Sequence, residues 1–173
     1  MFLKIFVYLS LIGVFSIVSA KNIDGFRGLK WGDSSSKLNY KQTTESGTYI
    51  VQNENLAIGD GMATKISYSF YKDKFYSASI YYTGLLNYQS IRRAMGLKYD
   101  IDGKCSNNYD STYEQCDGKD KKGNIYRSEW YNTDPGYGRI DIRNGKIFNE
   151  LMKQYEKDFN EKEDKERREV KGL

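Results

Sequence analysis

The chain contains no histidine, only two cysteines and a single proline among its 173 residues. Without histidine, Ser-His-Asp and Cys-His nucleophile arrangements and imidazole acid–base chemistry are excluded. The usual structural zinc sites require histidine or four thiolates, so they are excluded as well. No proline-rich linker and no internal repeat divides the sequence. We therefore expect a single domain, large enough to bury about two-thirds of its unfolded surface.

The first twenty residues have the pattern of an export signal. Lys4 gives a basic start, residues 5–18 are mostly apolar, and small residues end the segment at Ala20. The apolar run is shorter than the roughly 20 residues of a spanning helix. We expect cleavage after Ala20, no membrane span afterwards, and a periplasmic or secreted protein with net charge +3 instead of +4. An uncleaved membrane anchor is the alternative.

Export determines how the two cysteines are interpreted. In an oxidising compartment, Cys105 and Cys116, eleven positions apart, predict a disulfide. The C-x-x-C spacing of redox pairs is absent, so we interpret the bridge as structural. A loop of this length corresponds to a stabilisation of about 3 kcal/mol.

The clearest structural pattern extends from Ile66 to Tyr82. Apolar residues alternate with serines on both sides of a polar turn at 72–74. Period two on both sides of a turn predicts an antiparallel hairpin with one buried face. In this phase Phe75 and Tyr81 fall on the opposite face, where we expect them to be exposed contact residues.

A second hairpin is predicted around a turn at Asp134-Pro135-Gly136. The residues expected to point inward are Tyr126, Ser128, Trp130, Ile140 and Ile142. The residues expected to point outward are Arg127, Glu129, Arg139, Asp141 and Arg143.

Two short helices are predicted, one before each hairpin. One extends over residues 34–39 with Asp33 as its N-cap. The other begins after an Asn87 cap, has a hydrophobic staple of Leu86 with Ile91, and ends at Gly96.

The C-terminal region supports two interpretations. Asn144-Gly145 is typical of a hairpin turn, which would make the following residues a strand. Apolar residues recur every four positions, however, and this period favours a helix. Those residues are Ile147, Leu151, Tyr155 and Phe159. The overall prediction is an α+β fold, an antiparallel sheet built of hairpins with helices packed on one face. Residues 1–20 form the signal, 21–159 the domain, and 160–173 a charged helical tail with i,i+4 charge pairs.

Three short motifs match part of a known catalytic or metal-binding pattern, but each lacks residues that the pattern requires. Residues 34–37 match S-x-x-K, but no K-T-G element follows and the chain is too short for that fold. Residues 32–34 read G-D-S, a pattern found around the serine of some hydrolases, but such a serine needs a histidine base and the chain has none. Residues 100–103 suggest a calcium loop, yet the frame places Cys105 and Ser111 where glycine and glutamate are required. We predict no metal site, and no phosphate-binding glycine loop or other cofactor motif occurs.

The opening of the predicted mature chain, Gly25-Phe26-Arg27-Gly28-Leu29-Lys30-Trp31-Gly32-Asp33, resembles a loose group of small exported bacterial proteins of unknown function. That group shares an F-R-G-x-x-W-G opening after the signal peptide. The resemblance implies a bacterial envelope location and supplies no catalytic residues.

These observations predict a non-enzymatic exported protein that binds another protein or an envelope glycan. The candidate surface combines Phe75 and Tyr81 with Arg127, Arg139 and Arg143. Nucleic acid is a poor partner because the net charge is small and acidic residues interrupt the arginines. The alternative is a carboxylate-based hydrolase of envelope glycans, with a pair such as Glu45 and Glu54.

Overall fold

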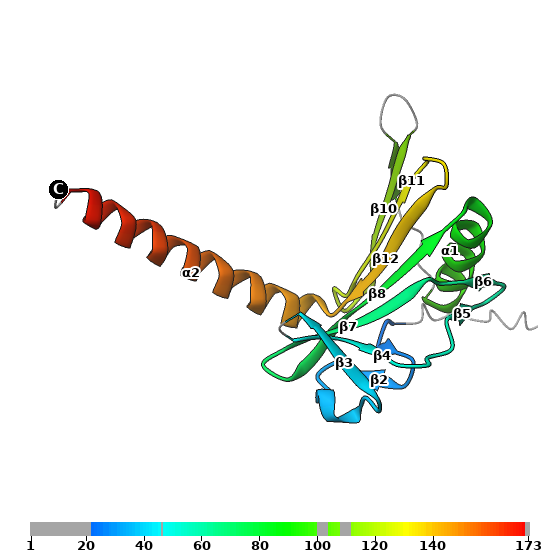
Figure 1. Cartoon of the computed structure of the whole chain (residues 1–173), viewed down its shortest axis with the longest axis horizontal. Helices are drawn as coiled ribbons and strands as arrows, with labels where there is room; N and C mark the ends of the chain where they lie inside the picture. The colour runs from blue at the N-terminus through cyan, green and yellow to red at the C-terminus, as the bar shows by residue number, and fades with distance from the viewer. Residues whose placement is uncertain (1–21, 46, 100–103, 108–111, 172–173) are drawn as a thin grey trace, which may run out of the picture.

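The computed structural model describes residues 22–45, 47–99, 104–107 and 112–171 (Figure 1). The predicted signal peptide and the acidic turn at 100–103 lie outside the described residues. Within them the fold is α+β, as predicted, and an eight-stranded antiparallel sheet dominates it.

The strand order in the main sheet is β3-β4-β7-β8-β12-β11-β10-β9. In chain order these strands are β3 (Lys41–Glu45), β4 (Thr48–Val51), β7 (Lys65–Tyr71), β8 (Lys74–Thr83), β9 (Lys104–Asn107), β10 (Tyr113–Lys119), β11 (Ile125–Tyr131) and β12 (Tyr137–Arg143). Two small two-stranded sheets are formed by β1 (Gly25–Phe26) with β2 (Leu29–Lys30) and by β5 (Ala57–Ile58) with β6 (Gly61–Met62). The helices are a 3₁₀ turn at Ser35–Lys37, α1 (Leu85–Tyr99) and α2 (Gly145–Lys171).

The sheet consists of two meanders that meet in its centre. One meander consists of β3, β4, β7 and β8, with the small β5–β6 sheet inserted between β4 and β7 in the chain, and the other consists of β9, β10, β11 and β12. The chain leaves β8, passes through α1, and enters β9 at the far edge of the sheet. The second meander then returns strand by strand until β12 pairs with β8.

One face of the sheet, here called the inner face, carries the core. The apolar side of α1 packs on it through Tyr88, Ile91, Met95 and Tyr99, all buried. Apart from Tyr76, which the alternation also predicted to be buried, both predicted hairpins supply it with the residues expected to point inward. Ile66, Tyr68, Ala78, Ile80, Tyr82, Tyr126, Trp130, Ile140 and Ile142 are all at most 6% exposed. The inward-facing phase predicted for the second hairpin is therefore confirmed.

Stacked rings fill the end of the core next to α1. Tyr88 of α1 lies parallel to Trp130 with the ring centroids 5.0 Å apart, and Tyr82 stacks beside both. Gly138 makes room for this stack, since a Cβ at that position would lie 2.8 Å from the Tyr82 ring and closer still to the Glu129 carbonyl.

The predicted exposure of Phe75 is wrong. Ser69 pairs with Ser77 but Phe70 pairs with Phe75, so Tyr76 is an extra residue on β8 and forms a β-bulge. A bulge shifts the alternation by one position. Phe75 therefore turns to the inner face, where it is fully buried and stacks on Trp31 at 5.0 Å.

The beginning and end of α1 also differ from the prediction. The helix begins before Asn87, whose side chain instead accepts from the Met62 N–H and donates to the Thr83 carbonyl. Leu86 is 79% exposed and forms no hydrophobic staple. Gly96 lies inside the helix, because buried Tyr99 continues the apolar side for one more turn. At the earlier turn, Ser34 is the N-cap in place of Asp33.

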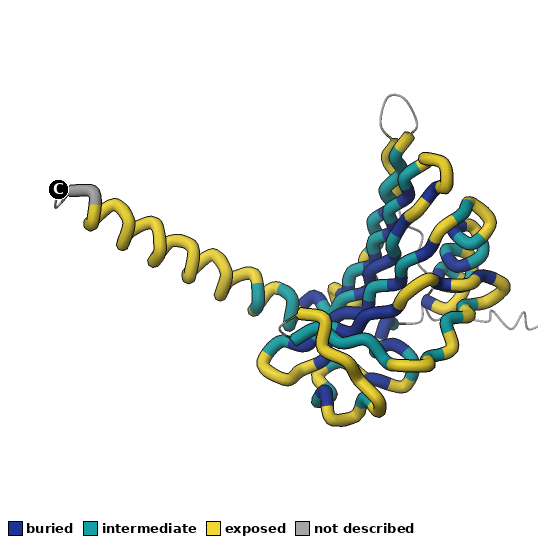
Figure 2. Tube along the Cα trace, viewed as in Figure 1, coloured by how far each residue is buried: buried dark blue, intermediate teal, exposed yellow. Residues whose placement is uncertain are grey.

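The C-terminal region is a helix, as its four-residue period predicted. Asn144 caps α2 by accepting from the Ile147 N–H at 2.9 Å, so Asn144-Gly145 begins a helix and does not form a hairpin. The helix then projects from the body, and almost its whole length is exposed (Figures 1 and 2). Of the predicted charge pairs, Glu163 with Arg167 forms at 3.5 Å. Unlike the inner-face helix α1, α2 starts on the other side of the sheet, where Phe148 packs against Arg143.

Candidate binding surface

Four of the five predicted surface residues lie on one face. Tyr81 on β8, Arg139 and Arg143 on β12 and Arg127 on β11 occupy the positions that alternate with the buried ones. Arg139 is the direct cross-strand partner of Tyr81. We call this side of strands β8, β12, β11 and β10, opposite to α1, the outer face. Phe75 is excluded from it by the bulge.

A buried carboxylate organises the centre of the outer face. Asp141 is only 1% exposed although it lies on the outer side of β12. Its Oδ2 lies 2.7 Å from Arg143 Nη2 and 3.1 Å from Arg139 Nε. Ser79 on β8 donates its hydroxyl to the other carboxylate oxygen at 2.5 Å. One acidic side chain thus fixes two of the candidate arginines.

Two further ion pairs surround this centre of the outer face. Arg139 reaches Glu129 at 3.0 Å, and Arg127 donates to Asp117 at 2.7 Å. Burial alone would raise the pKa of Asp117, but hydrogen bonds from Arg127 and Gln115 hold it below its ordinary value. The arginines keep their planar groups partly exposed, with side-chain exposures of 21–38%. The centre of the outer face therefore presents ordered, largely neutralised polar groups.

A row of tyrosines continues the outer face toward the far ends of the strands. The rings of Tyr113, Tyr131 and Tyr137 lie side by side across β10, β11 and β12, with centroid separations of 4.8 and 4.9 Å. Tyr137 is 49% exposed. These three tyrosines were not among the surface residues predicted from the sequence. The signal for this row was available, since Tyr131 continues the outward positions of Arg127 and Glu129 by two residues.

Tyr81 connects the arginines to the neighbouring meander. It lies opposite Lys65 on β7, whose ammonium group is 4.1 Å from the centre of the Tyr81 ring. Its other neighbour is Arg139. The cation–π contact with Lys65 is favourable and holds Tyr81 in place on the face.

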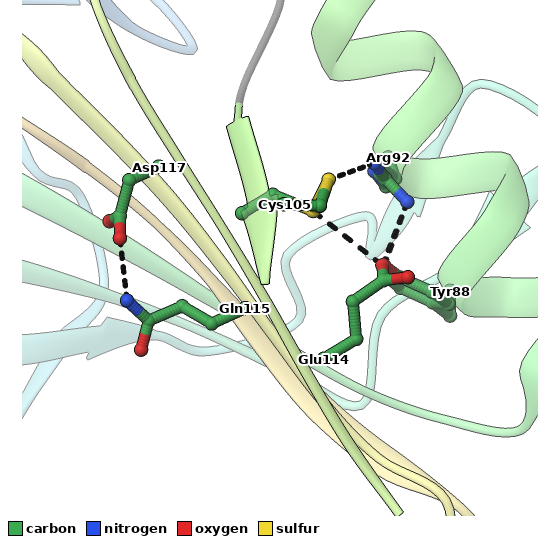
Figure 3. Close-up of a disulfide and its surroundings, with 7 residues drawn as sticks. Tyr88, Arg92, Cys105, Glu114, Gln115 and Asp117 are labelled. Atoms are coloured by element: carbon green, nitrogen blue, oxygen red, sulfur yellow. Dashed lines mark hydrogen bonds and ion pairs between the residues drawn. A yellow bond between two sulfur atoms is a disulfide. The ribbon is translucent and has the colours of Figure 1, made fainter. Parts of the chain in front are cut away.

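The disulfide lies on the inner side, at the edge of the sheet (Figure 3). Cys105 on β9 and Cys116 on β10 are direct cross-strand partners, so the predicted bridge is present. Arg92 of α1 donates to Cys105 Sγ at 2.8 Å and to Glu114 at 2.9 Å, and Tyr88 donates its hydroxyl to the same carboxylate. Burial and this carboxylate raise the pKa of Tyr88. The bridge and its contacts attach β9 and α1 to the body.

The surroundings of the bridge favour a structural role. Cys116 is buried and Cys105 exposed, so an incoming thiolate can reach only Cys105. It would have to expel a buried Cys116 thiolate beside Glu114, whose oxygen is 3.5 Å from that sulfur. Burial and a nearby carboxylate both disfavour a thiolate. The side chains of Cys105, Glu114 and Cys116 lie close enough together to hold a metal ion. The two sulfurs are bonded to each other, however, and are therefore not thiolate ligands.

The carboxylates considered for glycan hydrolysis are not brought together. Glu45 pairs with Thr48 at the turn end of the β3–β4 hairpin, whereas Glu54 follows β4 at its opposite end. Glu54 is bound by Arg27 at 2.8 Å and by the hydroxyl of buried Tyr68. This network ties the F-R-G opening to the segment between β4 and β5. It accounts for Glu54 without a catalytic role.

The S-x-x-K residues also have structural partners. Ser34 donates to Asp73 at 2.6 Å, which lowers the pKa of that carboxyl group. Lys37 is paired with Asp33 at 2.7 Å. Neither arrangement activates a serine nucleophile.

No protein-family profile, curated protein or solved structure matches this chain. Among the described helices, none is both long and apolar enough to cross a membrane.

Proposed function

We propose that this is an exported, non-enzymatic protein that uses its outer face to bind another molecule of the bacterial envelope. The observation that carries the proposal is the unequal covering of the sheet. The inner face is packed by α1 and by the β1–β2 and β5–β6 segments, whereas no described segment lies across the tyrosine end of the outer face (Figure 1).

The composition of the outer face fits a recognition surface. Tyrosine and arginine are enriched at protein interfaces, because both offer a large contact area and hydrogen-bonding groups. Here they stand on paired strands, and cross-strand contacts and ion pairs hold them in place. Little conformational entropy remains to be lost on binding, which favours affinity.

The charge distribution makes nucleic acid an unsuitable partner. Arg127, Arg139 and Arg143 each face a carboxylate within 3.1 Å. A phosphate backbone is bound mainly by cations that are free to replace its counterions. A partner with mixed polar and apolar groups, such as a protein or a glycan, suits this face better.

The test is affinity capture from native envelope extract with the mature chain, residues 21–173, immobilised. The informative variant is Tyr81→Ser combined with Tyr137→Ser, which removes outer-face rings without emptying the core. The matched control is Tyr40→Ser, since Tyr40 is 81% exposed and lies outside this face.

We expect one abundant species to be retained by the native chain and by the Tyr40→Ser control, and to be lost with the double variant. All three proteins should melt within a few degrees of one another. Equal retention by the double variant would refute the assignment of the outer face.

A further inference from the structure

A pocket of about 610 Å³ lies on the outer face where the sheet meets the beginning of α2. Its lining comes from β9, β10, β11, β12 and the first turn of the helix. The residues that line it include Lys104, Asp117, Lys119, Ile125, Arg127, Arg143 and Phe148. Two of the arginines predicted from the sequence, Arg127 and Arg143, therefore belong to one concave site.

The pocket has more positive than negative charge. Four cationic side chains line it against the single carboxylate of Asp117, which Arg127 already engages. Lys104 and Lys119 are exposed, and among the described residues no carboxylate lies within 4 Å of either ammonium group. The centre of the outer face is neutralised, but this end of it has cationic groups available for an anion.

An apolar area lies beside these cations. Ile125 and Phe148 are both half-buried, and the guanidinium group of Arg143 is 5.1 Å from the centre of the Phe148 ring. Phe148 is held there because Asn144 caps the helix immediately after β12. Concave sites with apolar walls and a few convergent polar groups are the usual form of small-ligand sites.

We infer that this pocket binds an anionic amphiphile, in which a phosphate or carboxylate group is attached to an apolar chain. The anionic group lies between Lys104, Lys119 and Arg127, and the apolar chain covers Ile125 and Phe148. The inference rests on the proposed function, because it names a ligand class for one end of the same outer face. The ligand is either a free small molecule or the headgroup region of a membrane lipid.

The first experiment titrates the mature chain with octyl phosphate below its micelle concentration and follows binding by calorimetry. Inorganic phosphate tests the headgroup alone, and octyl glucoside tests the apolar chain with a neutral headgroup. We expect octyl phosphate to bind more tightly than either. Equal binding of inorganic phosphate or of octyl glucoside would overturn the inference, as would the absence of octyl phosphate binding.

Variants locate the site. Lys104→Gln with Lys119→Gln should weaken octyl phosphate binding about tenfold, the usual effect of losing two exposed charge interactions. Lys37→Gln with Lys74→Gln removes the same charge at two exposed positions outside the pocket and should leave binding unchanged. Unchanged affinity in the Lys104/Lys119 variant would place the ligand elsewhere and refute the site.

Vesicles separate the two sources of ligand. If the native chain sediments with phosphatidylglycerol vesicles, and the Lys104/Lys119 variant does not, the source is a membrane lipid. Octyl phosphate binding without sedimentation identifies a free amphiphile, and both results support the pocket. Partner capture is scored separately with the Tyr81/Tyr137 variant, which leaves this pocket intact. Capture without octyl phosphate binding would reject the pocket alone, and the reverse would reject the proposed partner surface alone.

Discussion

The two faces of the same central strands are built from different chemistry. On β8, β12 and β11, most inner positions hold aliphatic or aromatic side chains with almost no exposed surface, and Ser128 and Gly138 are the exceptions. One residue further along each strand, the outer positions hold arginine, aspartate, glutamate, serine and tyrosine. The inner face is explained by burial alone. At its centre the outer face holds Asp141, a carboxylate that is almost fully buried. Its desolvation is costly, and a solvated side chain would avoid that cost, so stability alone does not explain this face.

The strongest test of this comparison is a pair of substitutions on β8. Phe75→Ser should reduce the free energy of unfolding by about 4 kcal/mol, because it removes a buried ring and leaves a cavity. Tyr81→Ser, on the other face, should cost less than about 1 kcal/mol. Chemical denaturation of both variants measures the difference. Similar losses would mean that Tyr81 also belongs to the core.

The second test concerns the one buried charge of the outer face. Asp141→Asn keeps the shape of the side chain but leaves Arg139 and Arg143 without their shared carboxylate. We expect a loss of about 2 kcal/mol, because both arginines are partly exposed and water can solvate them. Asp117→Asn is the matched control on an exposed pair and should cost less than about 1 kcal/mol. Equal losses in the two variants would show that the burial of Asp141 makes no difference to how much its ion pairs contribute to the free energy of unfolding.

The smallest expected loss of stability concerns the N-terminal segment around Ile23, which packs on the inner face. Asp120, in the β10–β11 turn, accepts from the Ile23 N–H at 2.9 Å and from the Asn124 amide at 2.8 Å. Burial alone would raise its pKa, but these hydrogen bonds and those from the backbone of Asn124 and Lys122 lower it. Asp120→Asn should therefore cost about 1 to 2 kcal/mol at neutral pH.

The pH dependence of this variant has a defined sign. A carboxyl group with a lowered pKa in the folded state stabilises the fold above the ordinary aspartate value. That contribution is lost as the pH falls below about 3.8 and through the lowered value. The stability difference between native chain and Asp120→Asn should shrink over that acidic range. A difference that stays constant with pH would exclude the charge of Asp120 as its cause.

Local patterns predicted much of the fold. The alternation of apolar and polar residues along the chain predicted both hairpins. The four-residue period of apolar residues after Gly145 correctly favoured a helix over a strand; these residues are Ile147, Leu151, Tyr155 and Phe159. Phe75 was misplaced because one extra residue, Tyr76, reverses the alternation. Nothing within the β8 segment itself marks that bulge, since it follows from how β8 pairs with β7.

The candidate surface was predicted only in part, because some of its features depend on a single strand and others depend on which strands pair. The outward phase of Arg127, Arg139 and Arg143 depends only on their own strands, so the sequence was sufficient. The tyrosine row depends on which strands are neighbours: Tyr113 and Tyr137 meet Tyr131 only because β10 and β12 flank β11. The pocket requires both this strand order and the direction in which α2 leaves β12, which no local pattern contains.

The order of the two meanders has a consequence for how fast the protein folds. Within each meander, each strand pairs with the next main-sheet strand along the chain, and β7 joins β8 through the two-residue turn Lys72-Asp73. The junction is different: Thr83 pairs with Tyr137 and Ser77 with Arg143, after a long excursion through α1 and the whole second meander. Closing such a loop costs entropy before any pairing is gained. Each half-sheet can therefore form early, and the joining of β8 to β12 is expected to limit the rate at which the complete sheet is assembled.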